Sequence, residues 1–117
     1  MYRVDKLIYI AGPYTHPDPV QNTHRAITVA DELIYHGFIP YIPHLTLLWH
    51  LVSPHNTQFW YDYDKHILKR CDAVLRIGGD SIGADQEVAL AKECGIPVFY
   101  SMEDLRPFKW NGYVGEG

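Results

Sequence analysis

Short apolar runs alternate with longer amphipathic stretches along the chain, and this alternation limits the folds that it can adopt. The runs Leu7–Ala11, Ala73–Ile77 and Ile96–Tyr100 have the length of buried strands, and a glycine lies directly beside each of them. A weaker run, Phe38–Pro43, contains two prolines, which predicts a strand that lies at the edge of the sheet or leaves the ladder early. Strands separated by helices predict an α/β fold with a parallel sheet.

Apolar residues at helical spacing fill the intervals between these runs. A helix is predicted over residues 18–37, with a proline in its first turn and a glycine at its end, and further helices over 59–70 and 84–93. Residues 44–57 are too apolar for a solvated loop and predict a short helix or an excursion that covers a pocket or meets another subunit. We therefore expect one domain over residues 1–117, a doubly wound (flavodoxin-like or Rossmann-like) parallel sheet of roughly four to five strands with helices on both faces.

Composition excludes several classes of protein. The net charge of −4 and the lack of a basic stripe argue against a nucleic-acid binder, although one arginine or one helix N-terminus can still bind a small anion. No apolar run reaches the length of a membrane span, and the polar start of the chain does not resemble a signal peptide. The two cysteines fit a reducing cytoplasm. The seven histidines show neither HxH nor HExxH spacing, so no metal site is expected.

Two loops are expected to meet at one rim of the sheet. Ligands of doubly wound sheets bind beyond the carboxyl ends of the strands, where residues 12–15 and 78–87 follow two predicted strands. Neither loop carries a GxGxxG or GxxxxGK[ST] phosphate-binding motif. Asn22 and Arg25 open the helix after the first loop and are either phosphate contacts or ordinary surface residues.

The run Ser81–Glu87 offers a hydroxyl and then opens a helix with a carboxylate, expected in the first turn. The free N–H groups at a helix N-terminus favour an anion. We therefore expect Glu87 to stay ionised near neutral pH, which suits a nucleophile or charge stabiliser better than a general acid. A carboxylate that only complements the helix dipole is the alternative.

Asp64 and Tyr9 are further candidates. Asp64 lies inside the apolar stripe that includes Trp60 and Ile67, and a carboxylate on the inner face of a helix is costly unless it is paired. Such a residue is often functional, although a structural bond to a loop backbone explains it as well. Tyr9 lies near the end of the strand predicted to be central, where its hydroxyl either reaches the rim or packs in the core.

Four segments, in this order and spacing, resemble one known family. They are Tyr9–Tyr14, Cys71–Arg76, Ser81–Glu87 and Gly95–Val98. The chain is similar to the nucleoside 2-deoxyribosyltransferase-like superfamily, which includes the deoxyribosyltransferases, the deoxynucleoside 5′-monophosphate N-glycosidases and many small bacterial and phage proteins of uncharacterised activity. The resemblance covers most of the chain.

The resemblance implies roles for individual residues. Glu87 matches the nucleophile, Asp64 the sugar-positioning aspartate, and Tyr9 the tyrosine at the strand end. In the monophosphate hydrolases a serine six residues before the glutamate contacts phosphate, and Ser81 stands at that position. Arg25 is the candidate for the basic residue that binds phosphate in these hydrolases. The substrate-binding residues expected on these grounds are Gly12, Pro13, Tyr14, Ser81, Gly83 and Arg25.

The function implied is cleavage or transfer at the N-glycosidic bond of a (deoxy)nucleoside or its 5′-monophosphate, without metal or organic cofactor. A nucleotide-sensing module without turnover is a second possibility. A phosphoribohydrolase of the lysine-decarboxylase-like type is a third, because Gly78 and Gly79 with Gly83 and Glu87 loosely match its PGGxGT motif. We also expect a homo-oligomer, since the apolar segment Leu45–Val52 and an aromatic tail exceed what one small core needs.

Overall fold

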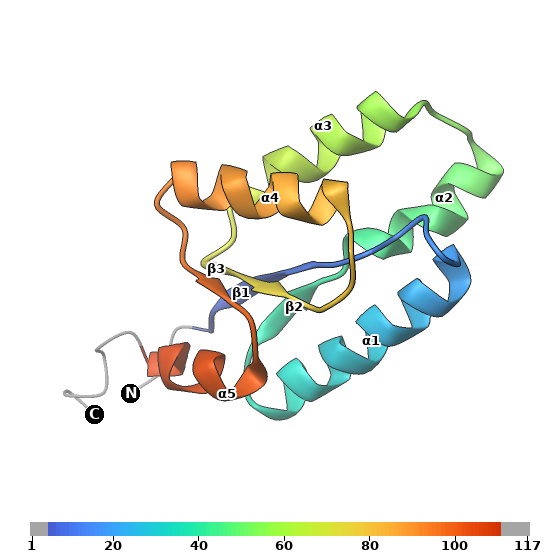
Figure 1. The fold of residues 1–117 in the computed structure, drawn as a ribbon. Coiled ribbons are helices and arrows are strands. Elements are labelled where there is room, and N and C mark those ends of the chain that lie inside the picture. Colours follow the sequence, from blue (N-terminus) through green and yellow to red (C-terminus); the bar gives the residue numbers. More distant parts are fainter. Residues whose placement is uncertain (1–4, 111–117) are drawn as a thin grey trace.

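A four-stranded parallel sheet forms the centre of the computed structural model, which describes residues 5–110. Its strands are β1 (Leu7–Ala11), β2 (Ile39–Tyr41), β3 (Ala73–Arg76) and β4 (Val98–Phe99), and their spatial order is β2-β1-β3-β4 (Figure 1). All three strand pairings are parallel. The predicted doubly wound α/β fold is confirmed, and so are the central position of β1 and the edge position of the proline-containing β2.

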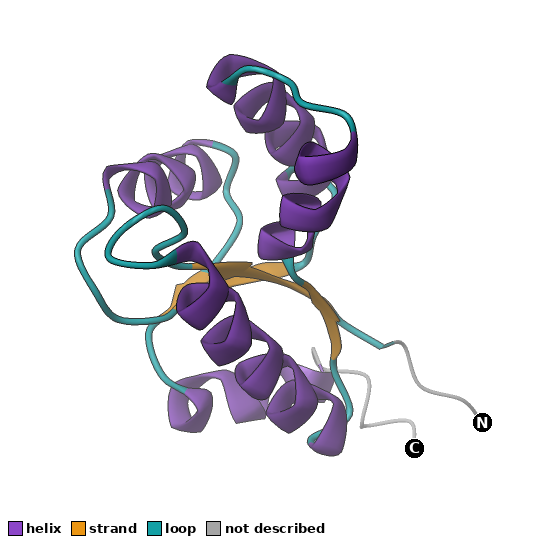
Figure 2. Ribbon diagram, turned by 90° about the vertical axis from the view of Figure 1, so that its right-hand side faces the viewer, coloured by secondary structure: helices purple, strands orange, loops and turns teal. Residues whose placement is uncertain are grey.

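Helices cover both faces of the sheet. Figure 2 shows α1 and α5 on one face and α3 and α4 on the other. Short 3-10 helices precede α2 and follow α5. The helices are α1 (Pro19–Tyr35), α2 (Thr46–Val52), α3 (Thr57–Leu68), α4 (Ile82–Glu93) and α5 (Met102–Leu105), and the 3-10 helices are Pro43–Leu45 and Arg106–Trp110.

Alternate residues of β1 supply two separate cores because successive side chains of a strand point to opposite faces. Ile8 and Ile10 join the cluster under α1, together with Leu33. Tyr9 and Ala11 join the cluster under α3 and α4. A tyrosine in a strand whose other residues are all apolar thereby faces the same side as α4.

Local signals set the ends of α1. The Asp18 side chain accepts a hydrogen bond from the Gln21 N–H at 3.2 Å, and Pro19 occupies the first turn. Gly37 ends the helix at a φ of 91°, a left-handed conformation that a side chain disfavours. These features match the helix predicted over residues 18–37.

The apolar segment 44–57 comprises the end of the 3-10 helix Pro43–Leu45, α2, the loop 53–56 and the first residue of α3, as expected for a short helix outside the sheet. In the tail, Leu105 is buried and Phe108 packs against the α1-side core, whereas the Trp110 side chain and Tyr113 lie outside the described residues. None of the helices in residues 5–110 combines the length and the apolar character that a membrane crossing requires.

The strand order also locates the switch point of the fold. From β1 the chain crosses to β2, and from β3 it crosses to β4 on the other side, so the connections diverge between β1 and β3. A crevice beyond the carboxyl ends of these two strands is the usual ligand site of such sheets.

Candidate active site

A cavity of about 900 Å³ opens at this switch point. The loop after β1, the segment from Pro43 to Tyr61, and the N-terminal half of α4 form its walls. Seven residues expected from the sequence line it, whereas Tyr9 lies beneath it and Arg25 is not part of its lining. The seven are Gly12, Pro13, Tyr14, Asp64, Ser81, Gly83 and Glu87.

Tyr9 and Glu87 form the central contact of this site. The Tyr9 side chain is fully buried under α4, and its hydroxyl donates to Oε2 of Glu87 at 2.5 Å. Burial raises the pKa of Glu87 to about 7, and the hydrogen bond from Tyr9 and the charge of Arg76 act in the opposite direction. Burial and the nearby carboxylates raise the pKa of Tyr9 well above its usual value, so Tyr9 stays protonated and donates.

The structure corrects the expected ionisation of Glu87. Helix α4 begins at Ile82, not near Ala84, so Glu87 lies in the second turn and Asp85 is the acidic residue of the first. Glu87 is therefore beyond the free N–H groups of the helix end, and burial dominates its pKa. With a pKa of about 7, it is not fully ionised at neutral pH.

Asp64 lines the same cavity from α3. The Tyr41 hydroxyl at the end of β2 donates to its Oδ1 at 3.2 Å. Burial raises the pKa of Asp64 to about 7, and the hydrogen bond from Tyr41 lowers it. The charge of Asp64 also raises the pKa of Glu87, so the two carboxyl groups influence each other's ionisation.

Ser81 caps α4. Its Oγ accepts a hydrogen bond from the Ala84 N–H at 3.0 Å, which leaves the hydroxyl proton available to a ligand. Arg76 holds the preceding turn through the carbonyl of Gly79 at 2.9 Å and the carboxylate of Asp85 at 3.1 Å. The turn and the first residues of α4 are thus tied to β3.

The two rim loops approach each other so closely that glycines are required. A Cβ at Gly12 would lie 2.3 Å from Cγ1 of Ile77. Gly79 has a φ of 113°, and a Cβ there would lie 2.8 Å from Cγ of Pro13. The backbone of each loop therefore lies directly against a side chain of the other, Gly12 against Ile77 and Gly79 against Pro13.

Asn22 and Arg25 differ in their placement. Asn22 is buried, and its amide donates to the carbonyls of Tyr14 and His16 at 3.0 and 2.9 Å. Asn22 thus stabilises the loop after β1. The sequence predicted either a phosphate contact or a surface residue at this position, and the structure shows neither. Arg25 is exposed, and its guanidinium lies beside the turn at Gly79.

Comparison with known proteins places the chain in a family. A family model described as "Domain of unknown function (DUF7768)" matches residues 6–101. The chain belongs to this family. No curated protein matches the sequence.

The DUF7768 domain shares its fold with a solved enzyme. The 2-deoxyribosyltransferase of the psychrotolerant bacterium Bacillus psychrosaccharolyticus superimposes with a TM-score of 0.60 at 20% sequence identity. The match covers 79% of this chain and 69% of that one. This likeness supports the fold relationship expected from the sequence.

Sequence reasoning about the DUF7768 domain missed His44. This buried histidine lines the cavity, and its Nε2 lies 2.9 Å from the Pro13 carbonyl oxygen. Because a carbonyl only accepts, Nε2 carries the proton and Nδ1 is the acceptor. Nδ1 is buried and has no hydrogen-bond partner in the part of the chain that the structure describes. Only the tertiary contact with the loop after β1 distinguishes His44 from the other histidines.

An aromatic wall on α2 and α3 was also missed. The Trp60 indole N–H donates to Nδ1 of His50 at 2.8 Å, and the His55 backbone N–H donates to the same atom at 3.2 Å. All three residues line the cavity. The cavity of the DUF7768 domain therefore combines two carboxyl groups with flat aromatic surface. Among residues 5–110, no cluster of three or more His, Cys, Asp or Glu side chains is arranged for a metal ion.

Proposed function

We propose that this protein cleaves or transfers at the N-glycosidic bond of a (deoxy)nucleoside or its 5′-monophosphate. The observation that carries the proposal is the Glu87 carboxyl, held by the Tyr9 hydroxyl at 2.5 Å, in a cavity that Asp64 also lines. A half-buried carboxyl with a fixed donor on one oxygen has its other oxygen free to attack an electrophilic carbon. The shared fold with a 2-deoxyribosyltransferase supports the same chemistry.

In the first step, ionised Glu87 attacks the anomeric carbon through Oε1. The carbon–nitrogen bond breaks, its electron pair goes to the base nitrogen, and a glycosyl ester of Glu87 forms. Asp64 holds the sugar hydroxyls or gives its proton to the departing base. The raised pKa of about 7 suits this role because a fraction of Asp64 is protonated near neutral pH.

In the second step, water or a second base attacks the anomeric carbon. The ester bond breaks and its electron pair returns to Glu87, while ionised Asp64 takes the proton of the attacking group. Water as the acceptor gives hydrolysis, and a second base gives transfer. The two displacements retain the configuration of the sugar.

Ser81 and the N-terminal end of α4 form the part of the site suited to a 5′-phosphate. The Ser81 hydroxyl proton is available, and the helix end favours an anion. Arg25 is the nearby cation expected to support this contact, from the adjoining rim. A preference for monophosphates over nucleosides would therefore depend on Ser81, and Ser81→Ala should reduce it.

A second copy of the chain is the partner proposed for the surface of α2. Leu48, Leu51 and Val52 are 70%, 67% and 80% exposed, in a segment that also lines the cavity at His50. Such a concentration of exposed apolar residues is typical of an interface. Light scattering at micromolar concentration should show an oligomer, and Leu51→Glu should dissociate it. A monomeric wild type contradicts this part of the proposal.

The test of the function is a chromatographic screen of nucleosides and monophosphates for released base, with and without an added acceptor base. We expect turnover by the wild type and a loss of at least about 1,000-fold in Glu87→Gln, which keeps the size of the side chain but removes the nucleophile. Glu93→Gln makes the same chemical change at the exposed end of α4 and should retain activity. Full activity of Glu87→Gln would refute the proposed nucleophile, and tight nucleotide binding without base release would support a sensing module instead.

A further inference from the structure

A second tyrosine–carboxyl pair lies beside the first. Tyr41 is directly opposite Tyr9 in the register of β2 and β1, so both side chains leave the sheet on the same face. Their ring centres are 5.5 Å apart. Tyr9 donates to Glu87 and Tyr41 donates to Asp64. Neighbouring strands thus supply one hydroxyl to each carboxyl of the site.

The bond from Tyr41 leaves one oxygen of Asp64 for a ligand. It engages Oδ1 at 3.2 Å, and no hydrogen bond among residues 5–110 that involves Oδ2 is observed. Asp64 is half-buried, and a hydroxyl donor both restricts its rotamer and favours its ionised form. Without that donor, burial would favour the protonated form further.

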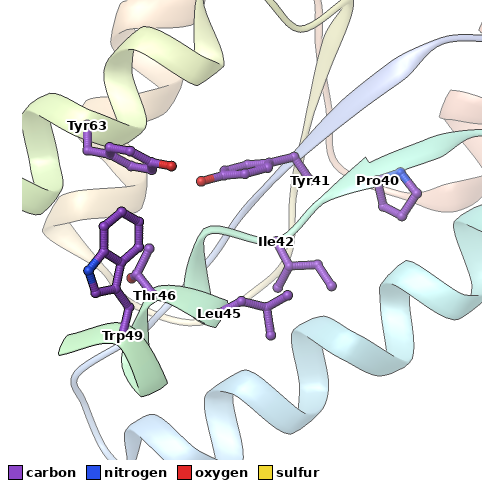
Figure 3. A pocket seen from close by; sticks show the side chains of 7 residues that line it. All are labelled: Pro40, Tyr41, Ile42, Leu45, Thr46, Trp49 and Tyr63. Carbon is purple, nitrogen blue, oxygen red and sulfur yellow. The ribbon is translucent and has the colours of Figure 1, made fainter. Parts of the chain in front are cut away.

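A second tyrosine close to Asp64, Tyr63, offers a matched control for Tyr41. Besides Tyr41 on β2, the titratable groups that act on this region are Tyr9 on β1, Glu87 on α4, Tyr63 on α3 itself and Cys71 shortly after α3. Figure 3 shows the hydroxyls of Tyr41 and Tyr63 directed toward each other across a smaller pocket of about 290 Å³. Tyr63 therefore shares the local environment of Tyr41, but no hydrogen bond to Asp64 is observed for it among the described residues.

We propose that Tyr41 is a positioning residue, whose hydroxyl fixes Asp64 with its free oxygen toward the cavity and favours the ionised carboxylate. The catalytic consequence rests on the proposed function. The effect of Tyr41 on the orientation and ionisation of Asp64 does not rest on the proposed function, because it follows from the hydrogen bond alone.

A carboxyl ¹³C NMR titration of the free protein tests, without any substrate, whether the Tyr41 hydroxyl affects the ionisation of Asp64. The Asp64 signal is assigned with Asp64→Asn, and its titration is compared in wild type, Tyr41→Phe and Tyr63→Phe. Loss of a hydrogen bond to a charged group should raise the pKa of Asp64 by roughly one unit in Tyr41→Phe. Tyr63→Phe should leave it near the wild-type value. An unchanged Asp64 titration in Tyr41→Phe, or an equal shift in Tyr63→Phe, overturns the inference.

A second variant covers the case in which Tyr41→Phe does not fold, which circular dichroism would reveal. Replacing Tyr41 by 3-fluorotyrosine keeps the ring and makes the hydroxyl a stronger donor. The pKa of Asp64 should then fall below its wild-type value. A rise or no change overturns the inference.

Enzyme kinetics separate this inference from the proposed function. On a substrate found in the screen, Tyr41→Phe should lower kcat about tenfold and change KM much less. The pH profile of kcat should move in the same direction as the pKa of Asp64 measured by NMR. Tyr63→Phe should change neither. Absence of any turnover in wild type refutes the proposed function, and the NMR comparison still decides the role of Tyr41. Turnover with a wild-type pH profile in Tyr41→Phe refutes the positioning role alone.

Discussion

Replacing Glu87 by glutamine should stabilise the protein at alkaline pH while it abolishes activity. The pKa of Glu87 is raised from 4.5 to about 7 because the carboxyl is buried. The folded state therefore holds a proton that the unfolded chain loses near pH 4.5. The stability contributed by this proton is complete below that pH and is lost as the pH rises through about 7. Glutamine is neutral at every pH and avoids the loss.

The size of the effect follows from the displacement of this pKa. A rise from 4.5 to about 7 corresponds to an upper limit of roughly 3 kcal/mol at pH 8. Glu87 also lines an open cavity, so water reduces the penalty, and we expect about 1–2 kcal/mol. For a domain of this size that is a rise in Tm of about 4–8 °C. Glutamine can still accept the hydrogen bond from Tyr9, so packing contributes little to the difference.

Thermal unfolding followed by circular dichroism from pH 4 to 8.5 tests this reasoning. Glu87→Gln should match wild type near pH 4, exceed it progressively as the pH rises from about 4.5 to about 7, and keep a constant advantage at higher pH. Glu93→Gln is the control, because Glu93 is exposed on the same helix and its change should give a pH-independent difference. A Glu87→Gln protein that is less stable than wild type at pH 8, or whose stability difference is the same at pH 4 and pH 8, would refute the argument that burial raises the pKa of Glu87.

Three further predictions concern the surroundings of this carboxyl. Tyr9→Phe removes the hydrogen bond that lowers the pKa of Glu87, so the acidic limb of the activity profile should move to higher pH, as measured by kcat/KM between pH 5 and 9. Gly12→Ala should lower the free energy of unfolding by about 1–3 kcal/mol in urea titrations, because its Cβ would lie 2.3 Å from Cγ1 of Ile77. Asn22→Ala should cost about 2–3 kcal/mol and reduce activity as well, because two carbonyls of the loop after β1 lose their donor. Wild-type behaviour of any of the three would show that the contact concerned is not needed.

Much of the architecture could be predicted because its signals are local. Apolar runs beside glycines marked the strands, and β1 has the predicted bounds. Helix α1 begins at a capping aspartate and a proline and ends at a glycine, all of which the sequence shows directly. Helix α4 was harder, since Ser81 could be read as a ligand contact or as a cap, and the cap places the helix start two residues earlier than expected.

The candidate site was predicted in part. The pattern of α3 placed Asp64 on an inner face, and the topology rule placed the loops after β1 and β3 at one rim, where the structure has them. The sequence did not indicate Tyr41 or His44. Tyr41 contacts Asp64 and His44 contacts Pro13, and these partners are 23 and 31 residues away along the chain. Nothing in the local pattern of either residue distinguishes it from an ordinary aromatic side chain.

The sequence by itself determined the order of strands and helices, the parallel sheet and the rim at which the cavity opens, because hydrophobic period and turn residues act over a few positions. Only the tertiary structure decided the chemical state of that rim. Packing of α4 against the sheet buried the carboxyl of Glu87 and moved its pKa to about 7, and pairing of β1 with β2 brought a second tyrosine to the second carboxyl. Ionisation and hydrogen bonding depend on which groups lie nearby in space and on how much water reaches them, and both arise only when distant segments pack together.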